Sequence, residues 1–205
     1  MAEVRLDERL PWALTWTRAE TLERSSHALV AGGRVWLVDP VADDHALLAA
    51  ERLGRITAVL QLLDRHPRDC ARLAVRYEVP HVRLPEHLPS APFEVLRIVW
   101  RPAWREVGLW WPEHAALVVP EAVGTTSYFA AGRALGVHPF LRLRPPRALS
   151  GLEPRYLLPA HGLALHDGAA DALREALARS RRDAPRAAIA GIRAFSPGRT
   201  RPPAR

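Results

Sequence analysis

The sequence predicts an α/β protein with a mixed β-sheet. Short apolar runs rich in β-branched residues alternate with helical patterns along the chain, and the first two runs are joined tightly enough to form a hairpin. The 205 residues are 48% hydrophobic, which is ordinary globular composition and enough for one domain with a full core. The elements expected for this fold class follow in chain order.

The hairpin is expected in the segment 25–41, "SSHALVAGGRVWLVDPV". Its two apolar runs flank Gly32 and Gly33, which accept the positive φ of a tight hairpin turn. The segment 43–54 then reads as a short helix that ends at Gly54, and the segment 56–63, "ITAVLQLL", reads as a strand covered on both faces.

Helical periodicity continues over 67–78, where a proline is acceptable in the first turn. The chain then becomes rich in predicted strands, and its clearest helix is 168–182, "GAADALREALARSRR". The strands are expected at 80–85, 93–100, 106–111, 115–120 and 155–162; the segment 126–135 is expected to be helical, and 140–146 to be a strand or extended.

The net charge of +7 is concentrated at the C-terminal end. From Arg179 onward there are eight arginines and one acid, whereas the preceding residues carry 21 basic and 21 acidic groups. We therefore expect a domain over 1–182 and a basic, disordered tail over 183–205. Nucleic acid is not favoured as a partner of the domain, and only the tail could bind it by charge.

The compartment expected from the sequence is the cytoplasm. No apolar run approaches the ~20 residues that a membrane-spanning helix needs. The N-terminus carries acids and a proline where a signal peptide would have a basic start and an apolar stretch, and the single cysteine, Cys70, excludes an intrachain disulfide. No membrane partner is expected, and no glycine-rich phosphate-binding motif occurs.

Four segments, in this order, resemble the metallo-β-lactamase family. They are the hairpin ending at Asp39, the segment 62–70 ("LLDRHPRDC"), the strand pair 107–123 ("VGLWWPEHAALVVPEAV") and the strand end 156–162 ("YLLPAHG"). The resemblance covers about residues 25–178. It implies an αββα sandwich of two mixed β-sheets flanked by helices, with hydrolysis of an ester, thioester or lactam by a metal-activated water.

The metal motif of the family, His-x-His-x-Asp-His, is degenerate in this chain. Only His66 in the motif and His161 near the end of the chain are retained, and Glu121 replaces the bridging aspartate. Arg68 stands where the motif has its aspartate, and the family's intermediate histidine has no counterpart. The positions that the resemblance assigns to the ancestral metal site are Asp64, His66, Arg68, Asp69, Glu121 and His161.

Two interpretations of this cluster remain open. In the first, no metal or other cofactor is bound, and Arg68, with Arg65, forms bidentate ion pairs with Asp64, Asp69 or Glu121. A guanidinium stays protonated and cannot be a metal ligand, which favours this interpretation. Loss of a partner from such a buried network typically costs ~3–5 kcal/mol, so Arg68→Ala should destabilise the fold.

In the second interpretation, His66, His161, Asp69 and Glu121 hold a metal ion, with Asp64 as a further carboxylate. A set so rich in carboxylates suits manganese or iron as well as zinc. The two histidines could equally be ordinary loop residues at strand ends.

Aromatic residues and one acid are candidates for lining a cleft beside the cluster. They are Asp39, Trp104, Trp110 and Trp111. The tryptophans could form an apolar pocket for a ligand, or they could fill the core. Trp110 and Trp111 must point to opposite faces if both lie in one strand.

The sequence therefore favours a protein of hydrolase ancestry with an eroded metal site. We expect it to be catalytically impaired or non-enzymatic, a pseudoenzyme that binds a small molecule or a protein partner in the ancestral cleft. The alternative is a metal-dependent hydrolase of esters, thioesters or lactams that uses the unusual ligand set.

Overall fold

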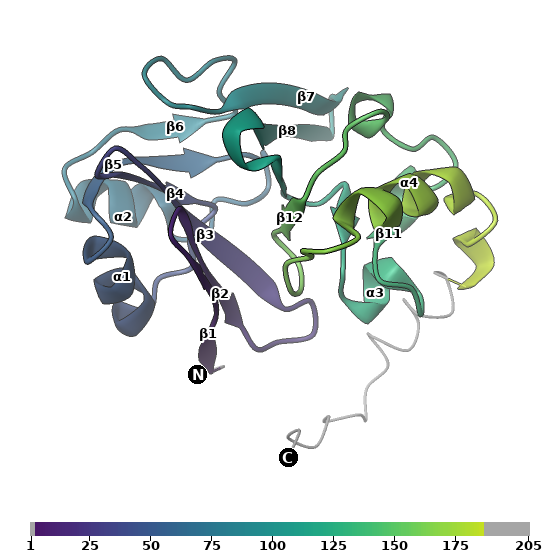
Figure 1. The fold of residues 1–205 in the computed structure, drawn as a ribbon, viewed down its shortest axis with the longest axis horizontal. Coiled ribbons are helices and arrows are strands. Elements are labelled where there is room, and N and C mark those ends of the chain that lie inside the picture. Colours follow the sequence, from purple (N-terminus) through teal and green to yellow (C-terminus); the bar gives the residue numbers. More distant parts are fainter. Residues whose placement is uncertain (1–2, 187–205) are drawn as a thin grey trace.

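Two mixed β-sheets face each other in the computed structural model, which describes residues 3–186 (Figure 1). The first sheet has the order β1-β2-β3-β4-β5-β6, antiparallel from β1 to β4 and parallel from β4 to β6. Its strands are β1 (Val4–Leu10), β2 (Ala13–Arg18), β3 (Arg24–Ala31), β4 (Arg34–Val38), β5 (Arg55–Gln61) and β6 (His81–Arg83).

The second sheet has the order β12-β9-β8-β7, with β12 parallel to β9 and the other pairs antiparallel. Its strands are β7 (Glu94–Arg101), β8 (Trp104–Trp111), β9 (Ala116–Val119) and β12 (Tyr156–Pro159). A separate two-stranded ribbon is formed by β10 (Val123–Gly124) and β11 (Gly136–Val137).

Helices cover the outer face of each sheet, which completes an αββα sandwich (Figure 1). The helices α1 (Asp44–Glu51) and α2 (Cys70–Arg76) pack on the first sheet, and α4 (Ala169–Arg179) packs on the second, with the short α3 (Ser127–Ala130) nearby. Three 3₁₀ turns are Pro112–His114, Pro139–Leu141 and Arg147–Leu149. Among the described residues, no helix has the length and apolar character needed to cross a membrane.

Three apolar clusters fill the spaces between these layers. The cluster between the sheets includes Trp12, Trp36, Phe93 and Trp111, whose rings meet edge to face at 4.8–5.5 Å between centroids. The other two clusters lie between each sheet and its helices. The fold class and the layer order predicted from the sequence are therefore confirmed.

The predicted hairpin joins β3 to β4. Gly32 and Gly33 both have positive φ, 53° and 70°, as a primed two-residue turn requires. The helix after it has Asp43 as its N-cap, whose carboxylate accepts the N–H of Ala46.

Several local predictions were wrong. The strands β1 and β2 were not predicted; β1 is a charged edge strand, and β2 is buried along nearly its whole length, so neither shows a clear alternation. The segment 140–146, predicted to be a strand or extended, instead begins with the end of a 3₁₀ turn at Pro139–Leu141. The helix α3 keeps only four residues of the predicted helix 126–135.

The predicted domain boundary at residue 182 lies just before the end of the described chain. Asp183 is still buried, and it lies 3.6 Å from the guanidinium of Arg179 on α4. The remainder of the predicted tail, residues 187–205, lies outside the described residues.

Candidate metal centre

Four strand ends bring the candidate residues to one edge of the sandwich. Asp39 directly follows β4, and His66 lies in the loop after β5; these two strands are parallel. Glu121 follows β9 and His161 follows β12, which are also parallel. Because the carboxyl ends of parallel strands lie at the same edge, residues far apart in the sequence converge there.

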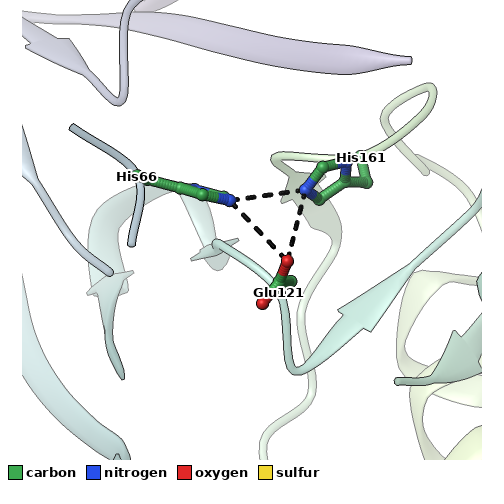
Figure 2. Close-up of side chains that lie close together, drawn as sticks. All are labelled: His66, Glu121 and His161. Carbon is green, nitrogen blue, oxygen red and sulfur yellow. Dashed lines mark hydrogen bonds and ion pairs between the residues drawn. The ribbon is translucent and has the colours of Figure 1, made fainter. Parts of the chain in front are cut away.

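His66, Glu121 and His161 point at a common centre (Figure 2). The two Nε2 atoms lie 3.4 Å apart, and each lies 3.9 Å from Oε1 of Glu121. Both imidazoles are buried, whereas the carboxylate of Glu121 is 14% exposed. The structure thus brings together three of the six positions that the resemblance assigns to the ancestral site.

Hydrogen bonds on the far side of each imidazole determine which nitrogen faces the centre. Nδ1–H of His161 donates to the carbonyl of Leu22 at 2.9 Å, and Nδ1–H of His66 donates to Oδ2 of Asp39 at 3.3 Å. Both Nε2 atoms are therefore unprotonated acceptors. With Oε1 of Glu121, they form a set of three acceptors that converge without a donor among them.

Asp39 therefore acts behind the cluster rather than as part of a cleft wall. Its carboxylate orients His66 and also accepts the N–H of Leu62 at 3.0 Å. Asp39 has φ +42° and Arg68 has φ +37°, which are unusual values for residues with a side chain. Such backbone strain is often found at functional sites, where the surrounding contacts maintain it.

A glycine next to His161 is required by close packing. Gly162 has φ +93°, and a Cβ there would lie 2.3 Å from Oγ1 of Thr125 and 2.8 Å from the backbone N of Thr126. This contact fixes the position of the loop that carries His161.

Arg65 forms the ion pair that holds Glu121. Its Nε and Nη2 both donate to Oε2 of Glu121, at 3.0 and 2.6 Å, which leaves Oε1 turned toward the histidines. The guanidinium also lies over the ring of Trp104, 3.9 Å from the centroid, and donates to the carbonyl of Ala103. The prediction that an arginine of this segment pairs with Glu121 is thus confirmed for Arg65.

The predicted ion pairs of Arg68 are wrong. Its guanidinium donates to three main-chain carbonyls, those of Ser25 at 2.6 Å, Asp39 at 2.7 Å and Ala160 at 3.1 Å. Burial lowers the pKa of Arg68, although the negative charge of Asp39 opposes this shift. Arg68 therefore ties the two sheets together at the edge where the cluster lies.

Asp64 and Asp69 do not join the cluster. Oδ2 of Asp64 accepts the N–H of Arg105 at 2.9 Å. The carboxylate of Asp69 accepts the N–H of Ala42 and an N–H of Arg72. Of the four predicted ligands, the structure therefore brings His66, Glu121 and His161 together but not Asp69.

Of the three tryptophans predicted to line a cleft or fill the core, all pack in the core clusters, and only Trp104 lies beside the metal-site candidates. Trp104 contacts Arg65 beside the cluster, but Trp111 lies in the core between the sheets. Trp110 points to the other face of β8 and packs against the core beneath α4, so the prediction of opposite faces is confirmed.

Glu106, which the sequence analysis did not single out, supports the Glu121 loop. Its fully buried carboxylate accepts the N–H groups of Glu121 and Ala122 and Nε1–H of Trp104, each at 2.8 Å. Burial raises the pKa of Glu106 to about 7 despite these three donors. One signal was available, since Glu106 alternates in β8 with Trp104, Gly108 and Trp110 and so must face inward.

Burial and nearby arginines keep the histidines of the site neutral. Burial, reinforced by Arg68, Arg65 and Arg24, lowers the pKa of His66 well below its usual value. Burial and the neighbouring His66 lower the pKa of His161 in the same way, with a further contribution from Arg68. Burial also raises the pKa of Asp39 to about 6, so at pH 7 the carboxylate accepts from His66.

A buried histidine beside this site should make stability depend on pH. His27 accepts from Oγ1 of Thr15 at 2.9 Å and donates to the carbonyl of Pro159 at 3.2 Å. Burial, aided by Arg68 and opposed by Asp39, lowers the pKa of His27 to about 4. The unfolded chain then binds a proton more readily than the fold, so stability present above pH 6.5 is lost as the pH falls toward 4.

For His27, this loss should amount to about 2 kcal/mol between pH 7.5 and pH 5. Urea unfolding of the wild type and of His27→Gln at both pH values measures it. We expect the difference between the two pH values to be smaller in His27→Gln by about that amount. Equal pH dependence in the two proteins would show that His27 is not held neutral.

The three converging acceptors suit one metal ion. Ligand atoms around a tetrahedral zinc ion, with bonds of ~2.0–2.2 Å, lie about 3.3–3.6 Å apart, close to the spacings of 3.4 and 3.9 Å in the cluster. Partners on the far side of both imidazoles are typical of metal-bound histidines. Three protein ligands would leave a position open, whereas Arg68 offers no ligand for a second ion.

Comparisons with known proteins agree with this architecture. No family model and no curated protein sequence matches the chain. Among solved structures, the metallo-β-lactamase DIM-1 exposed to ceftazidime matches with a TM-score of 0.58 and 12% identity, over 87% of this chain and 98% of that one. TMB-1 matches with a TM-score of 0.58 and 11% identity, over 92% and 100% of the two chains.

A third structure is that of the metallo-β-lactamase FIM-1 from Pseudomonas aeruginosa in its mono-zinc form. It matches with a TM-score of 0.54 and 12% identity, over 91% of this chain and 96% of that one. These identities are too low to transfer an activity, but the matches extend over nearly the whole described chain. Together with the two mixed sheets and their flanking helices, they show that this protein has the metallo-β-lactamase fold.

Proposed function

We propose that the protein is a hydrolase that works with a single metal ion held by His66, Glu121 and His161. The observation that supports this proposal is the convergence of three acceptor atoms, two imidazole Nε2 and one carboxylate oxygen, with no donor between them. Acceptors arranged in this way repel one another unless a cation lies among them. Zinc, manganese and iron are the candidate ions.

Each residue around the ion would have a distinct role. His66 and His161 would be neutral ligands oriented by Asp39 and by the carbonyl of Leu22. Glu121 would be the anionic ligand, with Arg65 holding its second oxygen. When bound, the ion would supply a Lewis acid that polarises a carbonyl group or lowers the pKa of a water molecule. An ester, a thioester or a lactam is the substrate class that this chemistry suits.

Metal content measured by plasma mass spectrometry tests the proposal. Protein purified without chelator, and again after reconstitution with zinc, manganese or iron, should retain about one equivalent. The variants His66→Ala and His161→Ala should retain less than about a tenth of this, because each loses one of three ligands. His87→Ala, which removes an exposed loop histidine, is the matched control and should retain the wild-type amount.

Screening with ester, thioester and lactam substrates then tests hydrolysis. Activity should require the metal and should be lost in the two histidine variants. Failure to retain any of the three metals would contradict the metal site, and a loaded protein without activity would contradict the hydrolase.

A second candidate is a metal-free binding protein on the same fold. It is favoured by the guanidinium groups of Arg65 and Arg68, which place two positive charges close to the histidines. In that case the ancestral cleft would bind a small molecule or a protein partner. The distinguishing result is that His66→Ala and His161→Ala keep the wild-type melting temperature and no preparation contains metal.

A further inference from the structure

A cavity of about 820 Å³ lies between β7, the segment 141–153 and α4. None of the three residues of the candidate metal centre lines it. Its volume falls within the ~300–1,000 Å³ typical of small-molecule sites. The proposed hydrolase activity gives this cavity no role, and its lining has a distinctive chemistry.

The floor of the cavity is aliphatic. Three separate parts of the chain supply it, and all of its side chains except that of Leu177 are buried. The floor residues are Ile98, Val99, Leu141, Leu149, Leu173 and Leu177. Trp100, which is 43% exposed, adds an aromatic wall. A hydrocarbon chain laid on this floor would be removed from water, at a gain of roughly 25 cal/mol per Å² of apolar surface buried.

The rim of the cavity is basic. One carboxylate, that of Glu153, lines it together with five arginines, namely Arg101, Arg144, Arg147, Arg174 and Arg181. Among these arginines, Arg174 is the one with carboxylate partners in the described part of the chain, namely Glu153 and Asp171. Within residues 3–186, the other four have no carboxylate in ion-pair range, and Arg181 donates instead to the carbonyl of Leu143.

We propose that this cavity binds a single aliphatic chain that carries an anionic headgroup. Unpaired guanidinium groups around one opening repel one another, and an anion among them relieves this repulsion. Guanidinium also matches carboxylate and phosphate with two parallel hydrogen bonds. Arginines that were simply exposed to water would not account for the concave aliphatic surface beneath them. The combination of floor and rim therefore favours an amphiphile over a bare anion.

Calorimetric titrations with matched ligands test the proposal on the full chain. Dodecanoate and dodecyl phosphate, below their micelle concentrations, should bind, and added NaCl should weaken both. Dodecanol lacks the charge and inorganic phosphate lacks the chain, so each should bind at least about tenfold more weakly. Preference for dodecanoate or for dodecyl phosphate identifies the headgroup.

Variants localise the binding to the cavity. Arg144→Gln combined with Arg147→Gln should weaken dodecanoate binding at least about tenfold, whereas Arg155→Gln, an exposed arginine outside the cavity, should leave it unchanged. Ala178→Trp should block binding by filling the cavity from the exposed side of α4. His66→Ala should still bind dodecanoate, which separates this site from the metal centre.

Three outcomes would overturn the proposal. They are absence of dodecanoate and dodecyl phosphate binding, dodecanol binding as tightly as dodecanoate, and wild-type affinity in both the double arginine variant and Ala178→Trp. Thermal melting of each variant verifies that the fold is retained.

Discussion

Replacing Arg68 with alanine is expected to lower the free energy of unfolding by about 3–5 kcal/mol. The guanidinium is buried and donates to the main-chain carbonyls of Ser25, Asp39 and Ala160, which belong to both sheets. Alanine would remove a donor from each of these three acceptors, although the carbonyls of Asp39 and Ala160 keep a second donor, from Ser26 and Ser25. It would also create a cavity and remove the cation near the buried carboxylate of Asp39. Relief of the cost of burying a guanidinium offsets only part of this loss.

Urea unfolding, followed by tryptophan fluorescence, measures the effect. Arg72→Ala is the control, because Arg72 is exposed and pairs with Asp69 on the surface, so its loss should cost less than about 1 kcal/mol. Arg68→Lys should be intermediate, since an ammonium keeps the charge but cannot reach three carbonyls with a planar fork. A free energy of unfolding of Arg68→Ala equal to that of the wild type would contradict this role of the guanidinium.

For Arg68, the sequence predicted the position of the residue but not its hydrogen-bond partners. The resemblance assigned Arg68 to the segment that carries His66, and the structure places this segment at the cluster. The permanent charge of a guanidinium indicated that Arg68 could not be a metal ligand. The acids around it, Asp64 and Asp69, looked like its partners because they are neighbours in the sequence. The actual acceptors are carbonyl groups of residues up to 92 positions away. Because every residue has a main-chain carbonyl, the sequence does not indicate which of them accepts a hydrogen bond.

The layers of the fold could be predicted better than its edges. The segment 56–63 is a continuous apolar run because β5 lies inside the first sheet, with neighbours on both sides. The edge strand β1 carries acids and arginines, which prevent the open sheet edge from pairing with another chain. The same charges interrupt the alternation of apolar and polar residues by which a strand is recognised. Of the candidate site, His66, Glu121 and His161 were assigned by the family resemblance, and each lies within three residues of the end of an apolar run.

Glu106 was missed because its role depends on a partner loop rather than on its own segment. It is the one carboxylate on the face of β8 that also carries Trp104 and Trp110, and it lies beside the Glu121 loop only after β8 and β9 pair. A buried acid in an otherwise apolar face needs donors, and these come from that loop. Its replacement should therefore affect both stability and the metal centre.

We expect Glu106→Ala to cost about 3–5 kcal/mol of stability, because it leaves the N–H groups of Glu121 and Ala122 and Nε1–H of Trp104 without acceptors. Glu106→Gln should cost less, about 1–3 kcal/mol, since its amide oxygen can still accept from the two backbone groups. The NH₂ group of the glutamine would then face Nε1–H of Trp104, so that two donors would lie opposite each other with no acceptor between them.

A double-mutant cycle with Trp104→Phe isolates that conflict. In the Trp104→Phe background, Glu106→Gln should be less destabilising than in the wild type by about 1 kcal/mol, because the opposing donor is gone. If the protein holds a metal ion, Glu106→Ala should also weaken metal binding about 10–100-fold, since the Glu121 loop loses its anchor while all three ligands remain. Wild-type stability in both Glu106 variants would mean that the loop is held without this carboxylate. Weaker metal binding in Glu106→Ala would instead show that a residue outside the ligand set fixes the geometry of the centre.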